Sequence, residues 1–500
     1  MEIKYSPVLT NITNCPTEFV QYLSDKLEHY MDEEYLKLFV KAVGRGFPFT
    51  NQYAFKATIN NNNLYDVVLY SGFIKDVLLD IYADRTCVEK QDLVLSSTQE
   101  KYIPSSFKVS SVLYEHQQRI VKSCLQHKRG IIKSPTGSGK SYAIAELVRK
   151  FSEENMNVLI TVPTISLLNQ MTGDINKYYE LNGLDSLNIG QVGNGNFEYK
   201  NVTVGIPNSL SKTDRTSDFL QTVDVIIADE VHTCANPTYA SIISCLVNIK
   251  ASFGFSATPD IEDASNIMLN AFFGSRVIDI QETEMIQKNI IMEPEFRFLT
   301  APAGFIAKPL GQKASNISNL GDKERYKILN LVYDSLITNN KGRNNLIVKT
   351  AIDRINLDVG PIIIIVNKVK GNSSHAGPIQ QALSKQGYEL PIISGYISKK
   401  KRAEIIEDLK SSKIHGAIAG PKILTAGISI PSLSTIILCG AGKSNSEFVQ
   451  RVGRLLRKKD GKEKPIVYDF IDSQFWFSNQ SKSRIETAEF IYGEDSVKRM

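Results

Sequence analysis

One stretch of the sequence carries glycine, lysine and serine in the order that a phosphate-binding loop requires. The run IIKSPTGSGKS ends at Ser141, follows a short apolar stretch and precedes the helix-like YAIAELVRKF. Gly137 and Gly139 would let backbone N–H groups point at phosphate oxygens, and the start of the following helix favours an anion. Lys140 would reach the β- and γ-phosphates, and the Ser141 hydroxyl would bind Mg²⁺. The predicted nucleotide-binding residues of this loop are Ser134, Pro135, Thr136, Gly137, Ser138, Gly139, Lys140 and Ser141.

Two adjacent acids end the apolar run of VDVIIADEVH (223–232). Ionised carboxylates are costly to place beside apolar residues unless a partner charge accompanies them. A Mg²⁺ ion at the phosphate loop would be that partner for Asp229. Glu230, one residue further on, would be placed to polarise an attacking water. The loop and the acid pair together predict an ATPase that uses ATP and Mg²⁺.

Short apolar runs that alternate with helix-length amphipathic stretches indicate the elements that position these residues. The runs are NVLITV (157–162), NVTVGI (201–206), DVIIA (224–228), PIIIIVN (361–367), KILTA (422–426), TIILC (435–439) and PIVYDFI (465–471). Near-continuous Val and Ile runs are typical of parallel strands that helices cover on both faces. The runs fall into two groups, and we expect a hinge or exposed loop plus a helix in the gap between them, about residues 293–345. The predicted fold class is therefore α/β, with two tandem parallel-sheet domains.

The first hundred residues have a different pattern. They contain a helix-like stretch (17–43) and two strand-like pieces, YAFKATI (53–59) and LYDVVLY (64–70). This mixture predicts a small α+β domain, whose role in binding nucleic acid is left open. The predicted domains are an N-terminal accessory domain over 1–105, a first parallel-sheet domain over 106–292, and a second over 293–500 with a short C-terminal tail.

Composition sets limits on the class of protein. With 42% hydrophobic and 22% charged residues, the chain has the composition of a soluble globular protein. No apolar run approaches the ~18 residues of a membrane span, so we expect no membrane segment and a cytoplasmic location. Six scattered cysteines without metal-ligand spacing predict reduced, buried thiols. A net charge of +5 permits a polyanionic partner without establishing one.

Eight motifs between about Leu113 and Asp472 resemble those of the superfamily 2 helicases and translocases, and they occur in the order found in that family. The motifs are LYEHQQ (113–118), TVPTISLLNQ (161–170), VGIPNSL (204–210), GFSATP (254–259), IIIIVNKVK (362–370), PIISG (391–395), TAGISIPSL (425–433) and QRVGRLLR (450–457). The resemblance implies that both parallel-sheet domains are RecA-like. It also implies a substrate strand held mainly through its phosphates, without base preference.

The resemblance assigns further residues to the nucleotide. Gln117 is expected to read the adenine edge, and Gly427 to contact the nucleotide, although Ser429 replaces an Asp that often binds the ribose. Arg454 and Arg457, at i and i+3, would share one face of a helix and act as arginine fingers on the γ-phosphoryl group. The alternative for these two arginines is a solvated basic helix.

Other residues are expected to bind or respond to the nucleic-acid strand. Those expected to contact it are Pro163, Thr164, Ser209, Thr425 and Ala426, with Gly427 completing the turn. Those expected to couple hydrolysis to movement are His232, Ser256, Ala257, Thr258 and Gln450. The basic run 399–402 begins a helical stretch and fits either a DNA contact or a solvated helix start. Trp476 is interpreted as a packing residue and His375 as a loop residue.

Within the family, the GIS form of motif V and the chain's ending soon after VYDFID most resemble the phage UvsW-type DNA helicases. This implies ATP-driven unwinding or branch migration of forked and branched DNA in recombination, repair or replication, and a phage protein acting in the bacterial cytoplasm. We expect a monomer rather than a stable oligomer, and the sequence indicates no protein partner. The alternatives are an RNA helicase, a double-stranded DNA translocase, and a non-catalytic nucleic-acid scaffold. ATP turnover stimulated by nucleic acid separates the scaffold from the motors.

Overall fold

The computed structural model describes residues 2–5, 9–28, 55–59, 64–70, 94–97, 108–259, 265–371, 374–421, 430–440, 442 and 444–500. The chain divides into two compact units, which we describe separately. The first unit comprises Met1–Pro135 and Gly139–Ile280, and the second comprises Thr136–Ser138 and Gln281–Met500. The first unit ends at Ile280, whereas the sequence analysis placed the end of the first parallel-sheet domain at residue 292. The division into three domains stays a prediction.

A mostly parallel sheet forms the centre of the first unit. Its strands are β6 (Arg129–Lys133), β7 (Val158–Thr161), β8 (Gly190–Gly193), β9 (Asn196–Phe197), β10 (Val202–Gly205), β11 (Val225–Asp229), β12 (Ala251–Ser256) and β13 (Arg276–Asp279). Their order across the sheet is β13-β6-β12-β11-β7-β10-β8-β9. Strands β7, β10 and β12 are buried along their whole length. Burial of both faces explains why the Val- and Ile-rich runs predicted β7, β10 and β11 correctly.

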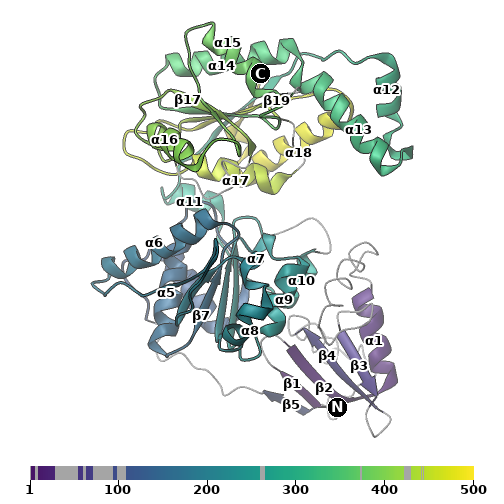
Figure 1. The fold of residues 1–500 in the computed structure, drawn as a ribbon, viewed down its shortest axis with the longest axis vertical. Helices are drawn as coiled ribbons and strands as arrows, with labels where there is room; N and C mark the ends of the chain where they lie inside the picture. The colour runs from purple at the N-terminus through teal and green to yellow at the C-terminus, as the bar shows by residue number, and fades with distance from the viewer. Residues whose placement is uncertain are drawn as a thin grey trace. The chain divides into compact units, whose positions relative to one another are not determined.

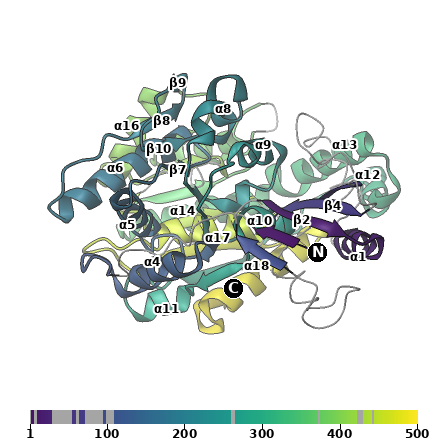
Figure 2. The same ribbon diagram turned by 90° about the horizontal axis from the view of Figure 1, so that it is seen from below.

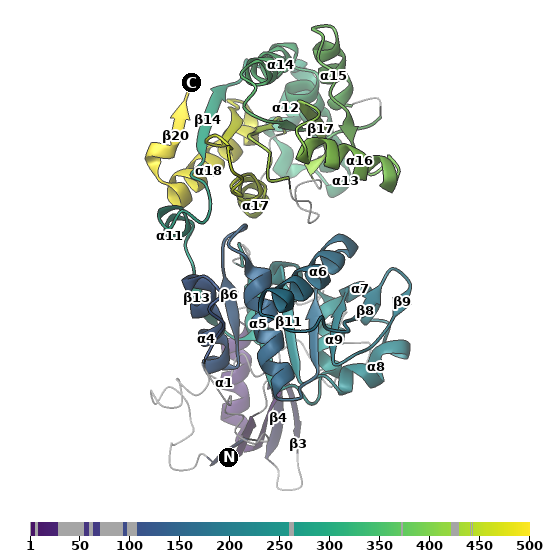
Figure 3. The same cartoon turned by 90° about the vertical axis from the view of Figure 1, so that its left-hand side faces the viewer.

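Helices cover both faces of this sheet. One layer consists of α4 (Glu115–His127), α5 (Lys140–Glu153) and α6 (Ile165–Leu181), and the other of α7 (Pro207–Leu210), α8 (Thr213–Gln221), α9 (Pro237–Cys245) and α10 (Ser265–Phe273) (Figure 1; α4 is labelled in Figure 3). The helix after β6 and the helix after β7 lie in one layer, and those after β10, β11 and β12 lie in the other. Because these five strands are parallel, the loops that follow them all lie at the carboxyl edge of the sheet, where ligands bind in open α/β folds.

The N-terminal part of the first unit is a smaller mixed sheet. Its strands are β1 (Glu2–Tyr5), β2 (Leu9–Cys15), β3 (Phe55–Ile59), β4 (Tyr65–Tyr70) and β5 (Val94–Ser97), in the order β3-β4-β2-β1-β5. Helix α1 (Thr17–Glu28) lies against this sheet and buries Phe19 and Leu23 (Figure 2). The predicted α+β pattern is confirmed, while the rest of the helix predicted over 17–43 lies outside the described residues.

A second parallel sheet forms the centre of the second unit. Its strands are β14 (Glu295–Thr300), β15 (Ile362–Ile365), β16 (Ile392–Ile393), β17 (Gly416–Ala419), β18 (Thr435–Leu438), β19 (Ile466–Ile471) and β20 (Val497–Arg499). Their order is β16-β17-β15-β18-β19-β14-β20, and β14 and β20 lie side by side at one end (Figure 3). The runs that predicted β15, β18 and β19 are confirmed, and KILTA (422–426) lies outside the described residues. The predicted α/β class with two RecA-like sheets is therefore confirmed.

The helices of the second unit also form two layers. Helices α14 (Lys341–Asn356) and α15 (Ala376–Ser384) cover one face, and α16 (Lys399–Lys410), α17 (Asn445–Leu455) and α18 (Phe475–Tyr492) cover the other (Figure 1). Two arginines in these helices form buried ion pairs with acids in and directly after β19. Arg484 binds Asp469 through two nitrogens, at 2.6 and 3.1 Å, and Arg343 pairs with Asp472.

The segment between the two groups of strands is more structured than the sequence indicated. Instead of a hinge or loop plus one helix, it contains β14, α12 (Lys308–Ser315), α13 (Asp322–Tyr333) and a π-helical turn, η5 (Asp334–Thr338), before α14 begins. Helices α12 and α13 share a small core of their own, which includes Leu336 and Phe477. The prediction was wrong because β14 alternates, with Phe296 and Phe298 buried and their neighbours half-buried, and so lacks a continuous apolar run.

Several smaller predictions concern single side chains. Trp476 packs against the α12–α13 core, as interpreted from the sequence. His375 lies in the loop directly before α15, as interpreted from the sequence, yet it is fully buried and its Nε2 lies 2.8 Å from Asn344 Oδ1. The described cysteines are free thiols, as predicted, and they are Cys15, Cys124, Cys234, Cys245 and Cys439. No helix within the described ranges is long and apolar enough to cross a membrane.

Candidate ATP and nucleic-acid sites

The loop after β6 has the backbone of a phosphate-binding loop. Gly137 and Gly139 have φ angles of +88° and +78°, a left-handed region that L side chains rarely adopt. Gly139 is the N-cap of α5, a helix of 14 residues whose first amides have no partner in the helix itself. The Lys140 ammonium group donates to the carbonyl oxygens of Ser134 and Pro135, at 3.0 and 3.4 Å. The lysine thus lies folded over the loop, which fits a site for anionic phosphates.

Gln117 lies in α4 and connects the start of that helix to the loop. Its Oε1 accepts from the Tyr114 backbone N–H at 2.9 Å, and its Nε2 donates to the Gly139 carbonyl at 3.1 Å. A Cβ at position 139 would lie 2.4 Å from Gln117 Nε2, so the glutamine amide occupies the space that only glycine leaves. The side chain predicted to read adenine is 2% exposed and supports the loop directly.

The acid pair lies at the carboxyl end of β11, two strands from β6 in the sheet. Asp229 is the last residue of the strand, and its Oδ1 accepts from the Glu230 backbone N–H at 3.1 Å. Glu230 itself has φ +56° and ψ +51°, a conformation that costs a non-glycine residue ~1–2 kcal/mol. Its Oε2 is buried and lacks a hydrogen-bond partner among the described residues. A buried carboxylate oxygen with spare acceptor capacity fits the activation of a water.

His232 connects the acid pair to the strand beside it. Its Nδ1 lies 2.9 Å from Ser256 Oγ, at the end of β12, and 3.6 Å from Glu230 Oε2. Ser256 Oγ also accepts from the Thr258 backbone N–H at 3.0 Å. Burial, opposed by Glu230 and aided by Lys140, lowers the pKa of His232, which favours the neutral ring. Because the Ser134 N–H donates to the Ser256 carbonyl, this chain of contacts also reaches the phosphate loop.

The predicted nucleic-acid contacts of the first unit lie after β7 and β10. Pro163 and Thr164 follow β7, and Thr164 caps α6 by accepting from the Leu167 N–H at 3.3 Å. Ser209 lies in the short helix α7, after β10. Pro163, Thr164 and Ser209 therefore all follow strands at the carboxyl edge of the sheet. Thr425, Ala426 and Gly427 lie outside the described residues.

The two predicted arginine fingers do not share a helix face. Arg454 lies in the last turn of α17 and is buried, as is Gln450 one turn earlier. Helix α17 ends at Leu455, and Arg457 follows its C-cap residue, Leu456. The i, i+3 prediction is therefore wrong in its geometry. The physical reason is the basic, glycine-containing sequence RKKDGK (457–462), which turns away through Gly461 at φ +74°.

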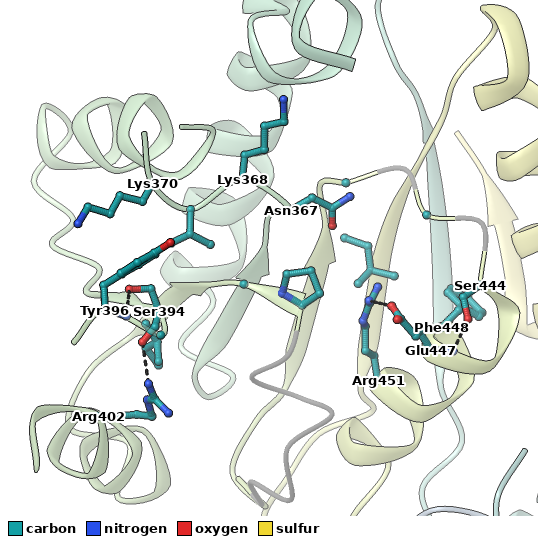
Figure 4. A pocket seen from close by; sticks show the side chains of 18 of the residues that line it. Asn367, Lys368, Lys370, Ser394, Tyr396, Arg402, Ser444, Glu447, Phe448 and Arg451 are labelled. Atoms are coloured by element: carbon teal, nitrogen blue, oxygen red, sulfur yellow. Dashed lines mark hydrogen bonds and ion pairs between the residues drawn. The ribbon is translucent and has the colours of Figure 1, made fainter. Parts of the chain in front are cut away.

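The second unit has a pocket of about 1060 Å³ at the carboxyl ends of β15 to β18. Its cationic lining residues are Lys368, Lys370, Arg402, Arg451 and Arg484, and its acidic lining residue is Glu447. Figure 4 shows Lys370 beside the ring of Tyr396, whose centroid lies 4.5 Å from the ammonium nitrogen, and Arg402 donating to the Ser394 carbonyl. The sequence had singled out only Arg402, as part of the basic run, which does begin a helix, α16. The available signal was position, since Lys368, Lys370 and Tyr396 each follow a predicted strand closely.

Two family models match the chain. The model described as the res subunit of type III restriction enzymes matches residues 110–261, which contain the phosphate loop and the acid pair. The model described as the helicase conserved C-terminal domain matches residues 343–459, which contain Arg454 and every lining residue of the pocket except Arg484.

Individual proteins are similar over a larger part of the chain. A provisionally named helicase of Sulfolobus islandicus filamentous virus is 27% identical over 377 residues, which cover 73% of this chain and 64% of the viral protein. The ATP-dependent DNA helicase uvsW of Enterobacteria phage T4 is 26% identical over 364 residues, which cover 72% of this chain and 68% of that protein. The solved structure of S. cerevisiae Dbp5 bound to RNA and ADP BeF3 has the same fold, with a TM-score of 0.53 at 15% identity, covering 78% of this chain and 90% of Dbp5.

Proposed function

We propose, from the premise that this chain is a superfamily 2 helicase and an ATP-dependent nucleic-acid helicase, that its substrate is forked or branched DNA. The observation that carries the proposal is the 26% identity to a phage DNA helicase over 72% of this chain. The cationic pocket of the second unit supports it, because phosphate contacts dominate the affinity of such proteins for nucleic acid. The processes served would be recombination, repair or replication.

The residues of the phosphate loop, the acid pair and the segment around Arg454 suggest how ATP is held and hydrolysed. The amides after Gly137 and the Lys140 ammonium group would bind the phosphates, and Ser141 and Asp229 would hold Mg²⁺. The metal ion, when bound, neutralises charge on the phosphates. Glu230 would orient and polarise the attacking water through its buried Oε2. Arg454 and Arg457 would stabilise the charge that develops on the γ-phosphoryl group.

The contact chain between His232 and Thr258 suggests how hydrolysis is coupled to movement. Ser256 contacts both His232 and the Thr258 amide, so a shift of the acid pair during hydrolysis would be transmitted to the segment after β12. We include Ala257 and Gln450 in this coupling role. Pro163, Thr164 and Ser209, together with Thr425, Ala426 and Gly427, would hold the strand through its phosphates.

The test is ATP hydrolysis measured alone and with single-stranded DNA, a forked DNA, a four-way junction and RNA, at matched salt. Stronger stimulation by the fork and the junction than by single-stranded DNA, abolished in Glu230→Gln, is the expected result. Stimulation by RNA alone would move the protein to the RNA helicases. Turnover with none of the nucleic acids would overturn the proposal in favour of a binding protein.

A further inference from the structure

The segment after α17 carries Arg457 and lies beyond the end of the helix at Leu455. The last carbonyl groups of any α-helix lack partners within the helix and need donors from elsewhere. In this segment three consecutive carbonyls receive such donors. Lys462 Nζ donates to the Leu455 carbonyl at 2.5 Å and to the Arg457 carbonyl at 2.9 Å. The Leu456 carbonyl accepts from the Met292 backbone N–H at 2.8 Å.

Lys462 is the one side chain in this set of three bonds, and it lies in an unusual environment. It is half-buried, and burial lowers the pKa of its ammonium group to about 8, with the nearby cations Arg457 and Lys459 adding to the effect. Two charged groups of the segment, Lys459 and Lys464, have partners elsewhere. Lys459 donates to the Lys410 carbonyl at the end of α16, and Glu293 of the segment before β14 pairs with Lys464 at 2.6 Å.

A lysine beside two cations is retained here because the carbonyls at a helix C-terminus attract a positive charge. A charged donor also makes a hydrogen bond roughly twice as strong as a neutral one does. Two such bonds from a single ammonium group close the turn from Leu455 to Lys462, and so fix the backbone from which the Arg457 side chain projects.

We propose that Lys462 is a positioning residue for Arg457: its ammonium group clamps the carbonyls of Leu455 and Arg457, and ATP hydrolysis depends on the positive charge of that clamp. The inference rests on the role proposed above for Arg457. It concerns how fast bound ATP is hydrolysed, because the clamp orders a residue that acts on the developing charge. The clamp therefore affects kcat and leaves the KM for ATP nearly unchanged.

The clamp makes a distinctive prediction for pH. As the pH rises through about 8, Lys462 loses its charge, and its two hydrogen bonds become those of a neutral amine. The wild-type kcat should therefore fall over this interval. In Lys462→Arg the guanidinium group stays charged and can reach both carbonyls, so kcat at neutral pH should be retained and the fall near pH 8 should disappear.

The experiment measures kcat and KM for ATP, with saturating DNA, from about pH 7 to about pH 9.5 for the full-length wild type, Lys462→Arg and Lys462→Met. Lys462→Met should lose about tenfold in kcat at neutral pH with KM for ATP within about twofold, since two charge-assisted bonds are removed. The matched control is Lys464→Met, two residues further on, which removes only the exposed pair with Glu293 and should behave as the wild type.

Three results would overturn the proposal: full kcat in Lys462→Met, a wild-type kcat that does not fall near pH 8, or the same alkaline fall in the wild type and in Lys462→Arg. If Lys462→Met fails to fold, as thermal melting will show, the pH profile of the folded Lys462→Arg protein decides alone. Arg457→Ala separates this inference from the function that it rests on. Full activity in Arg457→Ala would refute the finger role itself. Low activity in Arg457→Ala, together with an alkaline fall in Lys462→Arg as large as in the wild type, would refute only the clamp.

Discussion

The ATP site of the first unit and the base of the pocket in the second unit hold their polar side chains by different means. In the first unit Gln117 binds Gly139, and His232 binds Ser256, through hydrogen bonds between neutral groups. In the second unit Arg484 is held by Asp469 in a buried pair. A neutral hydrogen bond contributes only about 1 kcal/mol, while breaking a buried pair costs about 3–5 kcal/mol. The difference indicates that the first site can rearrange when nucleotide binds, whereas the second unit offers a fixed support.

The largest effect is expected from Glu230→Gln, which tests the chemistry of the first site alone. The substitution keeps the shape of the side chain and removes the charge that polarises water, so kcat for ATP should fall by about 10²–10⁴-fold. ATP affinity, measured by equilibrium binding of a fluorescent analogue, should change little. Unaltered turnover would show that the buried Oε2 has another purpose.

The next largest effect should come from the support of the second unit, in Arg343→Met. Arg343 is fully buried and pairs with Asp472, and its Cζ lies 4.6 Å from the centroid of the Phe470 ring. Loss of this side chain should therefore lower the free energy of unfolding by about 3–5 kcal/mol. The double variant Arg343→Met/Asp472→Asn should recover much of that loss. Chemical denaturation of all three proteins gives the comparison.

The same variant has a predicted pH dependence. Burial raises the pKa of Asp472 even with Arg343 present, and without that cation the pKa should rise further. A carboxyl group whose folded pKa exceeds its unfolded pKa stabilises the fold at low pH, and this contribution is lost as the pH rises through the folded value. Arg343→Met should therefore be closer to wild-type stability in mild acid than at neutral pH. An equal deficit at both pH values would contradict this.

A smaller effect is expected from Gly139→Ala, which tests how tightly the phosphate loop is packed. An alanine at φ +78° is strained by ~1–2 kcal/mol, and its Cβ would displace the Gln117 amide. Gly195→Ala is the matched control, because Gly195 has φ +88° and no atom within 4 Å of the added Cβ. If the two variants lose equal stability but only Gly139→Ala binds ATP more weakly, the loss of ATP affinity is caused by displacement of the Gln117 amide. Equal ATP binding would show that the glutamine yields freely.

The smallest effect should come from the surface of the pocket. Lys370→Gln removes one cation beside Tyr396, so DNA affinity should fall by about 0.5–1 kcal/mol and the dependence of log K on log salt should become shallower by about one. Lys482→Gln on α18, an exposed lysine paired with Glu486, is the control. A loss of affinity in Lys482→Gln as large as that in Lys370→Gln would indicate a general charge effect, not a contact at the pocket.

Much of the fold could be predicted because buried parallel strands leave a strong signal. β7, β11 and β15 each contain at least three consecutive Val, Leu or Ile residues, and Glu230 directly follows one of these strands. β14 was missed because only its alternate residues are buried. The signal that predicted the strands depends on burial of both faces, so a strand with one polar face escapes it.

The details of the site depended on contacts that no single motif contains. Arg457 has helical spacing from Arg454, yet the helix ends between them, and Lys462 and Met292 supply partners to the carbonyls at that end. Gln117 is 22 positions from the glycine that it contacts. Such pairings follow from the way the helices pack on the sheet, and local sequence does not encode them.

The left-handed backbone at Glu230 has a consequence for directed evolution. Asparagine or glycine adopts that conformation at lower cost, so a library selected only for heat resistance should enrich Asn or Gly at position 230. The selected variants would lack the carboxylate and would not hydrolyse ATP. A second library, selected for ATP turnover, should keep Glu at this position. Comparing the two libraries would then locate the reactive centre of this protein without a nucleotide-bound structure.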